Sequence, residues 1–189
     1  MNWLKGLLLA LTVVASWTAL LFVLAPAHQL MFTVIPPDGP VSATERIQID
    51  RSVSKYLLTG GRTLRRAAFT QQEQRHMADV RTLWLALVGI AMVGGAVQLW
   101  RPASENAAKA AAWITVAVGF ASFLSFSAVF VRLHELVFPN QDWLLPTSLS
   151  VLTRVYPEQF FLVSWALVLG CSLLSMLLWI RSAQGRCAR

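Results

Sequence analysis

The sequence predicts an all-α, polytopic membrane protein: a bundle of four transmembrane helices with an extracytoplasmic surface segment. Hydrophobic residues make up 56% of the 189 residues and charged residues only 13%, a composition outside the range of soluble globular proteins. Four apolar stretches are long enough to cross a hydrocarbon core, which takes a helix of about 20 residues. They are residues 7–24, 83–100, 110–131 and 160–180. We expect residues 1–189 to form a single membrane domain.

The basic residues at the two ends of the chain predict its orientation. Lys5 precedes the first span, and Arg181, Arg186 and Arg189 follow the last. Because cytoplasmic flanks are enriched in Lys and Arg, we expect both termini in the cytoplasm. Segments 25–82 and 132–159 are then extracytoplasmic. Alternatively, residues 1–27 are a cleaved signal peptide, although their apolar run is longer than most signal cores.

The extracytoplasmic segments contain helix and turn signals. Residues 35–40 are rich in Pro and Gly and predict a turn, whereas residues 42–58 predict an amphipathic helix that ends at Gly60 and Gly61. Thr70 and Glu73 have the spacing of a capping box. We therefore expect one helix to start outside the membrane and continue into the second span.

Small residues at helical spacing predict where the spans pack closely. Three such stripes occur, namely Ala91 with Gly95, Ala117 with Ala121 and Ser125, and Ala166 with Gly170. The net charge of +7 does not indicate nucleic-acid binding, because the basic residues flank apolar runs and form no extended stripe.

Two histidines are the candidate catalytic residues. His76 precedes the second span and His134 follows the third, so both are expected on the same side of the membrane near headgroup depth. Asp79 lies one helical turn from His76 and could fix its tautomer. Arg75, Arg81 and Arg132 could hold an anionic group nearby. His28 is expected to be only an interfacial anchor.

Several classes of chemistry lack their motifs in this sequence. It contains no nucleophile elbow, no phosphate-binding loop and no zinc-protease motif. We predict no metal and no cofactor, and histidine acid–base chemistry on a membrane-delivered substrate. Two alternatives are a haem-binding bundle, disfavoured because neither histidine lies inside a span, and a non-enzymatic membrane adaptor.

Three segments resemble the signature segments of a small bacterial family, the lipoprotein intramolecular transacylase (Lit) family. They are QQEQRHMADV at 71–80, HELVF at 134–138 followed by Asp142-Trp143-Leu144, and YPEQFF at 156–161. Their order and spacing match from the first outer segment to the last span, whereas residues 42–69 show little similarity beyond Tyr56-Leu57-Leu58.

The resemblance implies an acyltransferase of the bacterial cytoplasmic membrane, with its active site on the extracytoplasmic face. Its substrate would be an S-diacylglyceryl-cysteine lipoprotein, whose sn-2 acyl chain moves to its own α-amine to give a lyso-form lipoprotein. The two functional histidines of the family match His76 and His134. Positioning roles are assumed for Asp79, Arg132, Asp142, Trp143 and Glu158. A different lipid-modifying enzyme is the remaining alternative.

Overall fold

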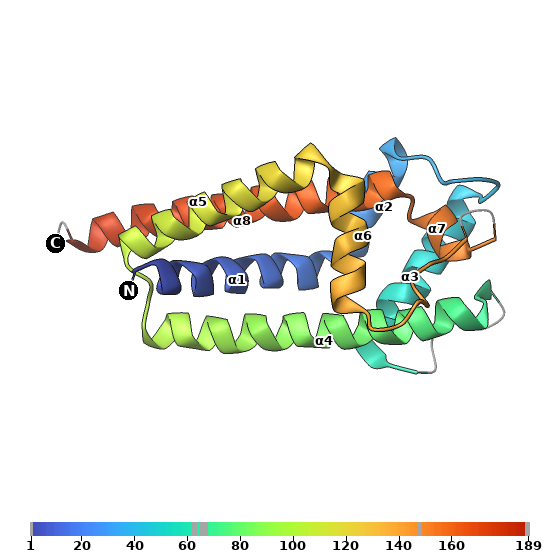
Figure 1. Ribbon diagram of the computed structural model, residues 1–189, viewed down its shortest axis with the longest axis horizontal. Helices are drawn as coiled ribbons and strands as arrows, with labels where there is room; N and C mark the ends of the chain where they lie inside the picture. The colour runs from blue at the N-terminus through green and yellow to red at the C-terminus, as the bar shows by residue number, and fades with distance from the viewer. Residues whose placement is uncertain (1, 62–63, 65–67, 147–148, 188–189) are drawn as a thin grey trace. The chain divides into compact units, whose positions relative to one another are not determined.

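The computed structural model describes residues 2–61, 64, 68–146 and 149–187, and every regular element in these ranges is a helix (Figure 1). The helices are α1 (Asn2–Leu21), α2 (Ala25–Val34), α3 (Ala43–Thr59), α4 (Gln71–Trp100), α5 (Glu105–Leu124), α6 (Phe126–Val137), α7 (Val151–Val155) and α8 (Glu158–Cys187). Helices α1, α4, α5 and α8 are long and apolar enough to cross a membrane. The predicted all-α membrane class is confirmed.

The chain divides into two compact units. We call Met1–Ala19, Ala86–Ser125 and Trp165–Arg189 the span unit, and Leu20–Leu85 with Phe126–Ser164 the histidine unit. The expectation of a single domain stays a prediction, and each unit is described by itself below.

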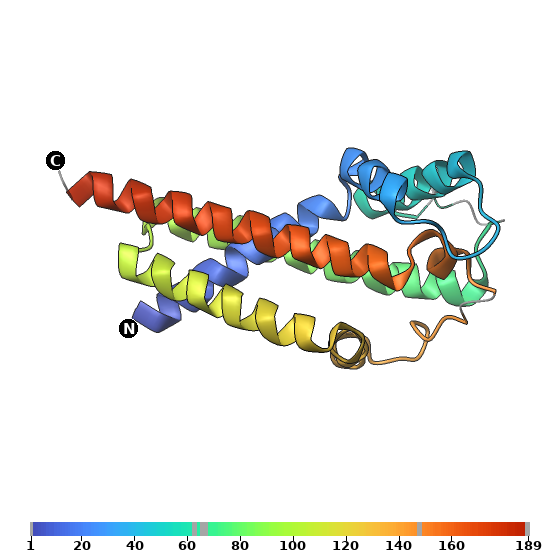
Figure 2. The ribbon, with the colours of Figure 1, turned by 90° about the horizontal axis from the view of Figure 1, so that it is seen from above.

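The span unit contains α1, α5 and the apolar parts of α4 and α8. In two perpendicular views these helices run along one long axis (Figures 1 and 2). The start of α1, the connection from α4 to α5 and the end of α8 lie at the same end of the unit. This is the arrangement expected when the termini of a four-span chain lie on one side.

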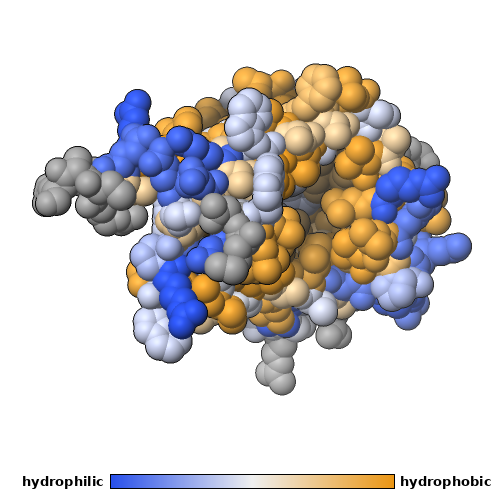
Figure 3. Space-filling view, turned by 60° about the vertical axis from the view of Figure 1, so that its left-hand side comes forward, coloured by the Kyte–Doolittle hydropathy of each residue, from blue (hydrophilic) through white to orange (hydrophobic). Residues whose placement is uncertain are grey.

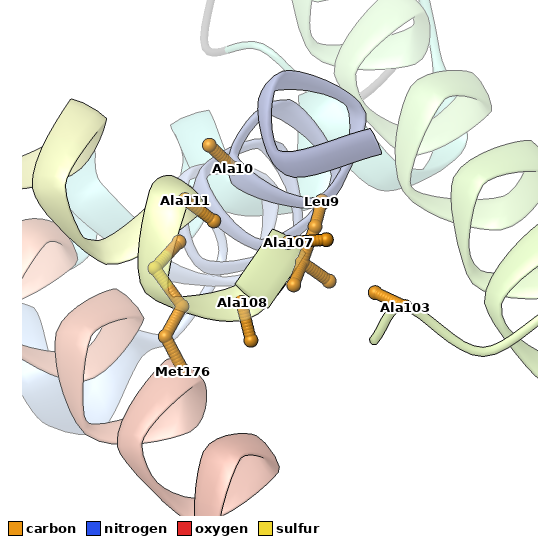
Figure 4. Close-up of a cluster of buried hydrophobic side chains, with 7 residues drawn as sticks. All are labelled: Leu9, Ala10, Ala103, Ala107, Ala108, Ala111 and Met176. Atoms are coloured by element: carbon orange, nitrogen blue, oxygen red, sulfur yellow. The ribbon is translucent and has the colours of Figure 1, made fainter. Parts of the chain in front are cut away.

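The core of the span unit is built from small side chains. Figure 4 shows its buried cluster of alanines with Leu9 and Met176. A Cβ atom placed on Gly6 would lie 2.8 Å from the Cβ of Ala110, so α1 and α5 approach as closely as only glycine permits. The predicted stripes do not include this contact. Gly95 and Gly170, which they do include, would place a Cβ in open space.

The outward surface of the span unit is apolar. On α4, the side chains of Met92, Val93, Leu99 and Trp100 are between 67% and 89% exposed. Figure 3 shows a face of the molecule where hydrophobic side chains predominate and hydrophilic ones gather in smaller areas. Such a surface is stable only in contact with hydrocarbon, as expected of membrane-spanning helices.

The third span is shorter than the sequence predicts. We expected helix to Val131, but α5 ends at Leu124, because Ser125 leaves the helical region with φ −155° and ψ 71°, and α6 begins at Phe126. The hydroxyl of Ser122 donates to the carbonyl of Val118, a local bond that competes with regular helix geometry. The apolar run at 110–131 therefore contains parts of two helices.

Residues at the helix ends determine where the first two helices of the histidine unit begin or end. Ser42 accepts a hydrogen bond from the backbone N–H of Glu45 at the start of α3, and Gly60 ends that helix with φ +75°, as predicted. Helix α2 was not predicted. Pro26 lies in its first turn, where the fixed φ of proline favours helix initiation.

Glu73 connects two distant helices of the histidine unit. It completes the predicted capping box of α4, in which its carboxylate accepts from the backbone of Thr70 at 2.7 Å. The other carboxylate oxygen accepts from the hydroxyl of Ser150 and the N–H of Leu152 at the start of α7. Glu73 is fully buried, and these bonds supply the partners that a buried carboxylate requires.

Candidate active site

His76 and His134 lie next to each other in the histidine unit. His76 is in the second turn of α4 and His134 is near the end of α6, and their ring centroids are 6.2 Å apart. This separation is well inside the distance at which two groups can both reach one reacting group, directly or through one water. The structure therefore brings the two candidate catalytic histidines together, which the sequence alone did not establish.

One ring nitrogen of His134 is committed to the backbone. Its Nδ1 lies 2.7 Å from the carbonyl oxygen of Phe130, one turn earlier on α6. A carbonyl can only accept, so Nδ1 carries the proton and Nε2 of the neutral ring carries a lone pair. Burial lowers the pKa of His134 below its ordinary value, against an opposing effect of the Phe130 bond. The ring is thus held neutral, with Nε2 available as a base.

Aromatic rings surround the histidine pair. The ring of His134 lies 4.2 Å from Phe130 and 5.3 Å from Trp143, and the ring of His76 lies 5.2 Å from Phe138. Offset and edge contacts of this kind hold flat rings in place and exclude water. They also explain why burial dominates the pKa of His134.

Asp79 does not orient His76 as the sequence suggested. Its carboxylate accepts a hydrogen bond from the amide of Asn140 at 2.8 Å. Nδ1 of His76 is buried and has no hydrogen-bond partner among the described residues. The sequence-based role of Asp79 in fixing the tautomer of His76 is therefore not seen in the structure.

Asp142 and Trp143 belong to a turn that lies along the first turns of α4. The guanidinium of Arg75 donates to both carboxylate oxygens of Asp142 at 2.9 Å, and this interaction holds the pKa of the Asp142 carboxyl below its usual range. Figure 1 shows the segment after α6 running beside α4. The sequence suggested that Arg75 holds an anionic group, and in the structure this group is Asp142.

Arg132 lies on α6, and Glu158 is the first residue of α8 and contacts the start of α6. Arg132 pairs with Glu135 one turn away at 2.7 Å, on a side of the helix where its side chain is 81% exposed. Glu158 accepts a hydrogen bond from the hydroxyl of Ser127 at the start of the same helix. Neither residue contacts the histidine pair among the described interactions.

The structure reveals a buried polar cluster that the sequence did not predict. Nδ1 of His28 lies 2.7 Å from a carboxylate oxygen of Asp50, which also accepts from the hydroxyl of Tyr156 at 2.8 Å. Burial and the neighbouring carboxylate raise the pKa of Tyr156, so its phenol remains a donor. His28 is only 5% exposed, and the expectation of an interfacial anchor is wrong.

Arg46 completes this cluster from the same helix as Asp50. Its guanidinium donates to the carbonyls of Val155 and Ile35 and lies 3.9 Å from the ring centroid of Phe32. Arg46 and Asp50 are one turn apart on the apolar side of α3, beside Ile49 and Val53. In the sequence, this cluster is indicated by two charged residues, Arg46 and Asp50, four positions apart on the same face of the predicted helix as the apolar residues Ile49 and Val53.

The described part of the chain contains no cluster of three or more His, Cys, Asp or Glu side chains that could hold a metal ion. The fold and the site therefore define a polytopic membrane protein with a paired-histidine site in its histidine unit.

Comparison with known proteins identifies the family. The profile of the lipoprotein intramolecular transacylase Lit matches residues 4–161, and the chain belongs to this family of membrane acyltransferases. Among curated proteins, none matches the sequence significantly.

Solved structures of the membrane-integral lipoprotein intramolecular transacylase Lit from Bacillus cereus have the same fold. One superposes with a TM-score of 0.73 at 19% sequence identity, covering 97% of this chain and 94% of the other. Two variants of that enzyme, with one histidine replaced by arginine or alanine, superpose with a TM-score of 0.66 at 18% identity. They cover 100% of this chain and 95% and 96% of theirs.

Proposed function

We propose that this acyltransferase moves the sn-2 acyl chain of an S-diacylglyceryl-cysteine lipoprotein to the α-amine of the same cysteine. The product is a lyso-form lipoprotein that carries one ester-linked and one amide-linked chain. The observation that supports the proposal best is the pairing of His76 with a His134 whose Nε2 is left basic by the bond to Phe130.

The chemistry requires one proton to move from nitrogen to oxygen. The amine attacks the ester carbonyl carbon, an N–C bond forms, and the bond from that carbon to the glycerol oxygen breaks. In the proposal, His134 accepts the amine proton through Nε2, and the proton is then returned to the departing glycerol oxygen. His76 faces the developing negative charge on the carbonyl oxygen and stabilises it by donating a hydrogen bond.

Histidine is a suitable base for this amine. The pKa of an α-amine is about 8 and that of free histidine is about 6.5, a mismatch of roughly 2 kcal/mol, and the burial that lowers the pKa of His134 widens this mismatch. The donor ester and the acceptor amine belong to one molecule. The site therefore has to orient these two groups toward each other and needs no pocket for a second substrate. No acyl-enzyme intermediate is required.

The remaining site residues are assigned supporting roles in this proposal. Trp143 forms one wall beside His134 and Asp142 fixes the adjacent backbone, while Asp79 acts through Asn140. Glu158 supports the start of α6, and Arg132 pairs with Glu135 on the exposed side of the same helix. The substrate arrives from the bacterial cytoplasmic membrane, and the proposal places the site on the extracytoplasmic face.

Mass spectrometry of a reporter lipoprotein tests the proposed function. The protein is co-expressed with the reporter in a bacterial host that lacks lipoprotein N-acylation. Substrate and product are isomers, so the mass of the intact lipopeptide should not change, whereas fragmentation should reveal an acyl chain on the N-terminal nitrogen. Unmodified diacylglyceryl cysteine, despite good membrane expression, would reject the proposal in favour of another lipid substrate or an adaptor.

The pH dependence of turnover tests the role of His134 as the base. Since burial lowers the pKa of His134, neutral His134 persists to lower pH than free histidine. The acidic limb that His134 contributes to turnover should therefore lie below a pH of about 6.5, separate from the limb of the substrate α-amine near a pH of about 8. The measurement is kcat against pH with a diacylglyceryl lipopeptide in proteoliposomes. A second acidic limb at a pH of about 6.5 or above, in addition to that of the amine, would contradict a buried neutral base.

A further inference from the structure

The turn that contains Trp143 is attached to α4 at three places. Arg75 binds both carboxylate oxygens of Asp142 at 2.9 Å, and the side-chain amide of Gln72 donates to the carbonyl of Leu144 at 3.1 Å. The third attachment is the bond from Asn140 to Asp79 at 2.8 Å. Trp143 therefore lies between two residues whose positions are fixed from α4.

These attachments come from the helix face that also presents His76. Gln72, Arg75 and Asp79 are spaced by three and four residues, which places them in one row on a helix, and His76 lies one turn after Gln72 in the same row. The turn thus crosses α4 beside His76 while its indole lies 5.3 Å from the ring of His134. One short segment contacts the surroundings of both histidines.

The energetics indicate that the ion pair serves position more than stability. The Arg75 side chain is 53% exposed and that of Asp142 is 21% exposed, and pairs this accessible contribute little to the stability of a fold. Yet the pair uses the two-pronged geometry that fixes both the distance and the plane of the carboxylate. Its loss should leave the protein folded and loosen the turn at Asp142, next to Trp143, while the bonds of Gln72 and Asp79 remain.

We propose that Arg75 is a positioning residue, which through Asp142 holds Trp143 against His134 and so fixes the separation of the two histidines. The expected loss of kcat rests on the proposed acyl transfer. The expected displacement of Trp143 from His134 does not depend on it. In this proposal Arg75 does not bind the substrate, because its guanidinium is already bound to Asp142.

A double-mutant cycle tests this proposal with the full-length protein in proteoliposomes. We expect Arg75→Gln and Asp142→Asn each to lower kcat about tenfold or more, because small displacements of catalytic groups have effects of this size, with KM changed less than about twofold. The double variant should be no slower than either single variant, since both break the same contact. Glu105→Gln, which breaks an exposed ion pair with Lys109, is the matched control and should retain normal kcat.

Histidine NMR provides a readout that does not depend on activity. The chain has three histidines, so the signals from isotopically labelled histidine can be assigned with single-site variants. Loss of the Arg75 bond should admit water to His134 and raise its pKa toward the ordinary value of about 6.5, and Glu105→Gln should leave it unchanged.

Two results would overturn the positioning role. Multiplicative effects on kcat in the double variant would show that Arg75 and Asp142 act separately, and unchanged titration of His134 in Arg75→Gln would show that the turn does not depend on the pair. If the wild-type protein instead produces no N-acylated lipopeptide, the proposed function fails, while the titration still decides whether Arg75 positions the turn.

Discussion

Replacing His134 or His76 with alanine should abolish formation of the N-acylated lipopeptide, with turnover reduced about 100-fold or more. Positioned acid–base groups contribute factors of this size, and the two rings, whose centroids are 6.2 Å apart, would act on the same reacting group. The double variant should be little worse than either single variant, because residues that act as one unit do not contribute additively. The measurement is single-turnover conversion of a diacylglyceryl lipopeptide by purified variants.

A control on the same helix makes this result interpretable. Leu136 lies two residues after His134 and is 84% exposed, so Leu136→Ala should retain full activity. Expression level and thermal unfolding must match wild type for all variants. Near-normal conversion by His134→Ala would exclude it as the base and would direct attention to the buried His28 cluster.

Replacing Asp50 with alanine should produce the largest loss of stability among single changes in the histidine unit. The substitution removes the shared acceptor of His28 and Tyr156 and leaves both, with Arg46, buried without it. Breaking a buried ionic contact on one side costs about 3–5 kcal/mol. Tyr156→Phe removes only one donor and should cost about 1 kcal/mol.

Thermal and denaturant unfolding in detergent micelles measures this effect. Arg51→Ala, an exposed neighbour on α3, is the control and should leave the free energy of unfolding within about 0.5 kcal/mol of wild type. An Asp50→Ala protein as stable as Arg51→Ala would show that the cluster contributes no net stability.

The sequence by itself determined the helical class, the number of helices that can span a membrane and several helix ends. These features depend on local physics. An apolar run of about 20 residues has few alternatives to a membrane helix, and the residues around Ser42, Gly60, Thr70 and Glu73 satisfy backbone groups within one turn of themselves. The histidines could also be assigned to one side, because that requires only the number of spans between them.

Only the tertiary structure decided which polar groups meet. Asp79 and His76 are one turn apart, yet Asp79 bonds to Asn140, 61 residues away, since a folded turn offers it a better donor. His28 and Asp50 are 22 residues apart, and Tyr156 is a further 106. No local pattern encodes such a contact. Its existence depends on how α2 and α3 pack with the segment before α8, where burial requires each polar group to find a partner.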